Sequence, residues 1–112
     1  MDVRARLRYL PISAQKVRLV VDLVRGKSAN EAMEILRLTN KRAARPLYKL
    51  LASAIANAEE NFGLSRDDLY VASIFADEGP TRKWRRFGAR GRFKPILRRT
   101  SHVTVILREY EA

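Results

Sequence analysis

The densest group of reactive side chains lies between residues 79 and 101, where basic and aromatic residues alternate and no acid occurs. Guanidinium and ammonium groups bind phosphates, and aromatic rings stack on unpaired bases. This composition predicts a segment that binds RNA, with Phe87 and Phe93 as additional stacking rings. The other predicted contacts are Arg82, Lys83, Trp84, Arg85, Arg86, Arg90, Arg92, Lys94, Arg98 and Arg99.

Two plainer explanations of this segment stay open. A basic run can be a solvated face or a disordered tail, and the Trp84 ring can fold back onto the rest of the protein. The segment is internal, however, and apolar, β-branched stretches that indicate strands bound it on both sides. Its position and its interleaved aromatic residues therefore favour RNA binding.

Carboxylates and the single histidine are the other candidates for chemistry. The pairs Asp67–Asp68 and Asp77–Glu78 have no histidine or cysteine nearby in the sequence, so we do not expect acid–base catalysis from them. We expect these acids to lie at element ends and to form salt bridges with the excess arginines. His102 is expected to make a structural hydrogen bond. The sequence thus predicts no catalytic residue, no metal site and no cofactor.

Composition narrows the class of partner. The chain has 112 residues, 46% of them hydrophobic, which suits one domain with a small core. Its 23 Lys and Arg against 12 Asp and Glu give a net charge of +11, so a polyanion is expected: nucleic acid first, an anionic membrane surface second. Most of the cations are arginines, which favours nucleic acid. There is no cysteine, and no apolar run approaches the roughly 18 residues that span a bilayer, so we expect a cytoplasmic protein without a membrane partner.

The first part of the chain predicts a strand and a helix. Residues 3–10 alternate apolar and basic side chains, as a half-buried strand does. Its inward side chains would be Val3, Ala5, Leu7 and Tyr9, and its outward ones Arg4, Arg6 and Arg8. A helix over 14–25 would be capped by Ser13 and closed at a left-handed Gly26. Its buried stripe would be Val17, Val20, Val21 and Val24.

Two more helices are expected. Ser28 and Glu31 match a capping box and predict a helix over 29–37. Its buried side chains would be Ala32, Ile35 and Leu36. Asn40 can cap a helix over 41–61, in which Pro46 indicates either a kink or a true start near Arg45. Gly63 would end that helix, and its apolar face would be Leu47, Leu50, Leu51, Ala54, Ile55 and Ala58.

The order of elements predicts the fold class. Residues 69–76 and 102–108 read as strands, so helices and strands are segregated along the chain. We expect an α+β fold, with three helices packed on a small three-stranded antiparallel sheet and a long protruding basic β-hairpin. Residues 1–112 would form a single domain, with 1–78 and 102–112 as the globular body and 79–101 as the hairpin. A reversal near Gly88 and Gly91 would let the hairpin reach roughly 30 Å from the body.

Basic residues outside the hairpin are expected to extend its contacts. The predicted RNA-binding residues of the body are Arg4, Arg6, Arg8, Lys16 and Arg18. A second basic group follows along the expected third helix: Lys41, Arg42, Arg45 and Lys49. This second group is either a solvated face or a further part of the RNA footprint.

A series of motifs along the chain resembles one known family. The motifs are KVRLVVDLVRG at 16–26, SAIANAE at 53–59, LYV at 69–71, DEGP at 77–80, ARGR at 89–92 and RRTSHVTV at 98–105. In this order and at this spacing, they resemble the bacterial large-subunit ribosomal protein L22 family over essentially the whole chain.

The resemblance implies a specific role. Members of the family place a compact α+β body near the outer surface of the large subunit, in contact with its ribosomal RNA. Their hairpin threads between RNA domains, and its tip lines the nascent-peptide exit tunnel near ribosomal protein L4 and the macrolide site. The family also assists early subunit assembly. Carried onto this chain, the tunnel-lining tip would be Phe87, Gly88, Ala89, Arg90 and Gly91.

The tip departs from the family pattern at two places. Many members carry Pro-Arg where this chain has Phe87-Gly88, and Lys94-Pro95 replaces a usual polar or acidic pair. These differences leave the expected fold unchanged, but the family's tip conformation cannot be assigned to this chain.

Three functions are compatible with a basic chain of this kind. A structural ribosomal protein fits best, with large-subunit RNA, neighbouring ribosomal proteins such as L4, and the nascent peptide as partners. A free-standing RNA chaperone is the second, and it would differ in specificity for the ribosome. A small nuclease is the third and fits least, because no acid–base pair accompanies the basic segment.

Overall fold

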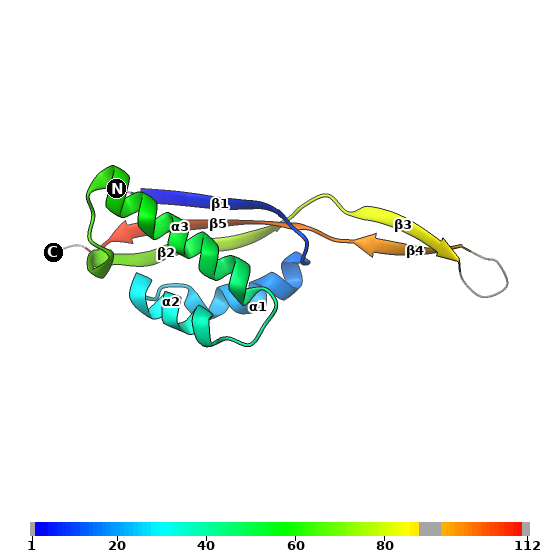
Figure 1. The fold of residues 1–112 in the computed structure, drawn as a ribbon, viewed down its shortest axis with the longest axis horizontal. Helices are drawn as coiled ribbons and strands as arrows, with labels where there is room; N and C mark the ends of the chain where they lie inside the picture. Colours follow the sequence, from blue (N-terminus) through cyan, green and yellow to red (C-terminus); the bar gives the residue numbers. More distant parts are fainter. Residues whose placement is uncertain (1, 88–92, 111–112) are drawn as a thin grey trace.

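A computed structural model describes residues 2–87 and 93–110 of the protein. The elements are β1 (Asp2–Leu10), α1 (Ala14–Val24), α2 (Ala29–Leu38), α3 (Ala44–Phe62), the short 3-10 helix η1 (Arg66–Asp68), β2 (Leu69–Glu78), β3 (Arg82–Phe87), β4 (Phe93–Arg98) and β5 (Ser101–Glu109). The molecule measures 67 × 25 × 18 Å along its principal axes. The long axis arises because β3 and β4 extend from the end of the body opposite the two termini (Figure 1).

The body is a three-stranded antiparallel sheet with the order β1-β5-β2, covered on one face by the helices (Figure 1). Val103, Val105 and Leu107 of the central strand are fully buried against them. Their alternate neighbours lie on the opposite face, because successive side chains of a strand point to opposite sides. The predicted α+β architecture is confirmed, including a separate two-stranded hairpin of β3 and β4.

Helices α1 and α2 form where the apolar spacing predicts them. The four valines of α1 have at most 1% of their surface exposed. Ser13 occupies the N-cap position of α1 without a side-chain cap hydrogen bond, whereas the Ser28 hydroxyl accepts from the Glu31 N–H at 3.2 Å. Ile35, predicted to be buried, is only half-buried, because the contact face of α2 is centred on Ala29, Ala32 and Leu36.

Helix α3 starts later than residue 41, and the alternative prediction of a true start near Arg45 is confirmed. Its first residue is Ala44 and its N-cap residue is Ala43, so the expectation that Asn40 caps this helix is wrong. Pro46 explains the later start, because a proline fits the first turn, where the backbone N–H groups have no helical partner. The predicted apolar face is buried as expected, and Gly63 ends the helix in the left-handed region, with φ at 65°.

The predicted alternation of β1 fails at Tyr9. The register with β5 shifts between Leu7 and Leu10, so one extra residue is accommodated and Leu10 takes the inward position. Tyr9 adopts a positive φ of 58° and is 62% exposed, not directed to the core. Its backbone N–H donates to Nδ1 of His102 at 3.0 Å, and its ring meets the imidazole edge-on, with centroids 4.8 Å apart.

The hairpin joins the body at a tight junction. The Gly79 N–H donates to the Thr100 carbonyl at 2.9 Å, and the Thr100 hydroxyl donates to the Pro80 carbonyl at 2.8 Å. A Cβ atom at position 79 would overlap the Thr100 hydroxyl oxygen and crowd the His102 ring. Only glycine fits between these groups, so the junction fixes where the hairpin leaves the sheet.

Candidate nucleic-acid interface

The register of the hairpin places cations directly opposite cations. Arg82 pairs with Arg98 across β3 and β4, and Arg86 pairs with Lys94. Like charges at directly opposed positions destabilise a strand pair, and an isolated two-stranded hairpin is marginally stable in water. No acid occurs between residues 79 and 101 to offset the repulsion. An external anion would therefore stabilise this strand pair.

The predicted tip lies mostly outside the described residues. Phe87 is the last residue of β3 and pairs with Phe93, the first of β4. The remaining predicted tip residues and one predicted RNA contact fall in the undescribed stretch: Gly88, Ala89, Arg90, Gly91 and Arg92.

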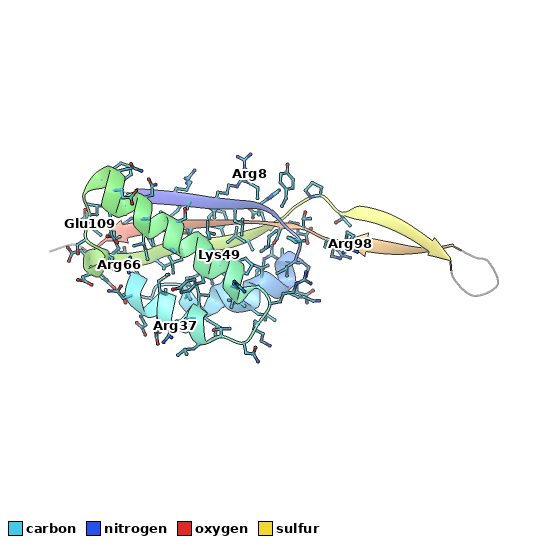
Figure 2. The ribbon with its side chains drawn as sticks, in the orientation of Figure 1. Arg8, Arg37, Lys49, Arg66, Arg98 and Glu109 are labelled. Atoms are coloured by element: carbon cyan, nitrogen blue, oxygen red, sulfur yellow. The ribbon has the colours of Figure 1, made fainter. Side chains whose placement is uncertain are left out.

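A basic cleft of about 860 Å³ lies at the root of the hairpin. Its cations come from the start of α1, the link between α2 and α3, and the end of β4, and they face one acid, Glu78. All of these cations are exposed. Together these cations line what is here called the root cleft: Lys16, Lys41, Arg42, Arg98 and Arg99. Figure 2 shows Arg98 at the point where the hairpin leaves the body.

A second hollow of about 590 Å³ runs between β1 and α3. Its floor is apolar, formed by Leu7, Leu10, Pro46 and Leu50, and its rim carries cations. The rim cations are Arg6, Arg42, Arg45 and Lys49. Because Arg42 lines both hollows, the second basic group of the sequence analysis joins the root cleft to the arginine row of β1. Figure 2 shows Lys49 on α3 and Arg8 beside β1.

Four cations of the described residues are neutralised within the chain, and none of them lines either hollow. The pairs are Arg25 with Asp22 at 2.6 Å, Arg37 with Glu34 at 2.5 Å, Arg66 with Glu59 at 3.0 Å, and Arg108 with Asp2 at 2.7 Å. The hydrogen bond from Arg108 holds the pKa of the Asp2 carboxyl below its ordinary value. Arg37 lowers the pKa of Glu34 in the same way. Among the described side chains, the root-cleft cations have no salt-bridge partner, so they remain available to an external anion.

Arg18, predicted to bind RNA, has a structural partner. Its Nε and Nη2 atoms donate to the Ala76 carbonyl at 3.2 and 2.9 Å, and Arg25 donates to the Ile74 carbonyl at 3.0 Å. Both carbonyls belong to β2, an edge strand whose outer carbonyls would otherwise lack protein partners. These two arginines dock α1 along the edge, a role that charge and spacing alone do not reveal.

The remaining polar candidates have structural positions. His102 accepts the Tyr9 hydrogen bond, as its predicted structural role requires. The carboxylate pairs lie at element ends, with Asp67 accepting from the Asn30 side chain at 2.8 Å. The expected salt bridges of these acids are not found among the described residues.

The described residues hold no group of three or more acidic or histidine side chains placed to bind a metal ion. Within the same residues, no helix has the length and apolar character needed to cross a bilayer. Neither finding adds a site to the basic surface.

Comparison with known proteins gives a consistent result. The sequence profile of the family described as ribosomal protein L22p/L17e matches residues 5–108. Two relatives, each named large ribosomal subunit protein uL22, are 53% identical over 111 residues, which is 99% of this chain and 100% of theirs. They come from Thermoanaerobacter sp. (strain X514) and Thermoanaerobacter pseudethanolicus (strain ATCC 33223 / 39E).

Proposed function

Because this chain belongs to the ribosomal protein L22p/L17e family, and so is a protein of the large ribosomal subunit, we propose that it binds large-subunit ribosomal RNA through its hairpin and root cleft. One observation carries the proposal. Cations from three separate parts of the chain converge where the hairpin leaves the body, and none has a salt-bridge partner among the described residues. Phosphates supply the missing negative charge.

The mechanism of binding follows from the shape. A narrow hairpin with cations on both strands contacts phosphates on two sides at once, which suits a crevice between RNA helices better than the outside of one duplex. The root cleft then holds the backbone where the crevice meets the body. By linking RNA segments in this way the protein assists assembly, with body and hairpin acting as one domain. Its role is structural, without catalysis or a cofactor.

The tip has a further role in this proposal. Residues 87–91 line the nascent-peptide exit tunnel, close to ribosomal protein L4 and to the growing chain. Glycines at positions 88 and 91 let the backbone approach neighbouring surfaces where larger side chains would not fit.

Charge reversal in the root cleft tests the RNA contact. Lys16→Glu changes the net charge as much as Lys27→Glu does, and Lys27 is an exposed cation outside both hollows. Tagged variants are expressed beside the wild-type protein, and their content in large subunits is measured after washing at high salt. We expect Lys16→Glu to be depleted and Lys27→Glu to be retained. Equal retention of both variants would refute a role for the cleft.

The tunnel position needs a separate test. The chain has no cysteine, so Ala89→Cys introduces a single thiol at the tip. In ribosomes stalled with a cysteine-bearing nascent chain, a bifunctional thiol reagent should join the two. Tyr9→Cys, at the other end of the hairpin, is the control and should give no such product. A product from both variants, or from neither, would refute the tunnel assignment.

A further inference from the structure

The face of the sheet opposite the helices carries an exposed aromatic ring among arginines. Since Val103, Val105 and Leu107 of β5 point into the core, Thr104 and Ile106 point to the other side. The register places Arg6 and Phe75 on either side of Thr104, and Arg4 and Ser73 on either side of Ile106. Directly opposed residues share a face, so these six positions form one surface, here called the open face.

Phe75 is the unexplained residue of the open face. Its ring is 40% exposed, although the neighbouring Thr104 is only 6% exposed. The core does not need this ring, because Ile74 and Ala76 supply the buried contacts of this part of β2. A half-exposed aromatic ring offers a surface on which a base can stack.

The arginines of β1 all lie on one side of the Phe75 ring. Arg6 and Phe75 are two strands apart, so their backbones are separated by roughly 10 Å. Arg4, Arg6 and Arg8 follow one another at intervals of roughly 6.6 Å along β1, and all three are exposed. None of them forms a salt bridge with another described residue, whereas Arg108 at the end of the face is neutralised by Asp2. At this separation, one nucleotide strand can place a base on the Phe75 ring and its phosphates beside the arginines of β1.

We propose that the open face binds unpaired nucleotides of ribosomal RNA, with a base stacked on Phe75 and phosphates held by Arg4 and Arg6. The inference rests on the proposed function and adds a second surface to it, on the sheet of the body. RNA is favoured over a protein partner by the chemistry of the face. An apolar protein surface would desolvate the arginines without an anion, at a high cost in free energy. A stacked nucleotide supplies an aromatic base for the Phe75 ring and a phosphate for the arginines.

Truncation of the ring gives the direct test. Phe75→Ala in the full chain should lower affinity for protein-free large-subunit ribosomal RNA by about 5- to 150-fold, the range for loss of one stacked base. Phe75→Tyr should retain affinity, because it keeps the ring. Phe62→Ala, which removes a 47% exposed ring from the end of α3, should bind as the wild type does.

The outcomes separate the inference from the proposed function. If the wild-type protein itself does not bind the RNA, the proposed function fails. If the wild type binds and Phe75→Ala binds equally well, the open-face inference alone is wrong. If Phe75→Ala weakens incorporation into intact subunits but not binding to the protein-free RNA, a neighbouring protein covers the face. That result also overturns the open-face inference. Should Phe75→Ala unfold, Arg4→Gln decides, because Arg4 lies on the open face and lines neither hollow. Unchanged affinity contradicts the inference, and a severalfold loss supports it.

Discussion

Replacing residues 82–97 with a two-residue Asn-Gly turn should leave the body folded while removing most of its affinity for ribosomal RNA. Asn-Gly suits the tight turn that antiparallel strands require. The core side chains of the body come from the three helices and from β1, β2 and β5. The hydrogen bond between Gly79 and Thr100 also lies outside the replaced segment, so the junction can remain closed.

The expected change in the salt dependence of RNA affinity follows from the number of cations removed. The replaced segment contains Arg82, Lys83, Arg85, Arg86, Arg90, Arg92 and Lys94. Each phosphate contact contributes about 0.7 to 0.9 to the slope of log affinity against log salt concentration, so the slope should fall by up to about 5 or 6. Fluorescence anisotropy with a large-subunit RNA fragment over a series of salt concentrations measures this slope, and circular dichroism follows thermal unfolding. An unchanged slope would refute electrostatic binding by the hairpin, and an unfolded body would refute its independence from the hairpin.

Three further predictions concern single residues. Gly79→Ala should lower the free energy of unfolding by about 1–2 kcal/mol, because its Cβ displaces the Thr100 hydroxyl from its acceptor; an unchanged melting temperature would show that the junction relaxes freely. Asp2 has a pKa below the ordinary 3.8, so its ion pair stabilises β1 above that pH and loses its effect as the pH falls through the lower folded-state value. In NMR, Asp2→Asn should therefore remove the acid-dependent shift of the β1 amides, and its persistence would contradict this origin. Arg90→Glu should reduce incorporation into large subunits more than Lys49→Glu does. Equal incorporation would contradict the prediction that the hairpin contributes more to RNA binding than the cations beside α3.

Local patterns were sufficient for most of the fold. The spacing of the valines in α1 and of the apolar residues in α3 predicted their buried faces, because helical periodicity alone decides which side chains meet the core. The backbone irregularity of β1 was not predicted. Nothing in the alternation of β1 signals the extra residue that turns Tyr9 outward, since that feature depends on a hydrogen bond to His102, 93 residues away.

The proposed RNA-binding surface was predicted only in part. The basic hairpin was evident because its cations are consecutive in the sequence. The root cleft was not, because Lys16, Arg42 and Arg99 become neighbours only through the packing of α1 and the α2–α3 link beside the junction. Arg18 has a second role that its charge did not reveal, because its guanidinium, predicted to contact phosphate, also holds a β2 carbonyl. Sequence reveals the number of cations, and tertiary packing determines which of them are free.

The most direct test of the account is amide hydrogen exchange of β3 and β4 in the free protein and in assembled large subunits. Opposed like charges and the absence of acids imply that these strands gain their stability from RNA phosphates. We expect rapid exchange in the free protein, slow exchange in the subunit, and slow exchange of β5 in both. Strong protection of β3 and β4 without RNA, unchanged on assembly, would contradict the central claim that ribosomal RNA stabilises the hairpin.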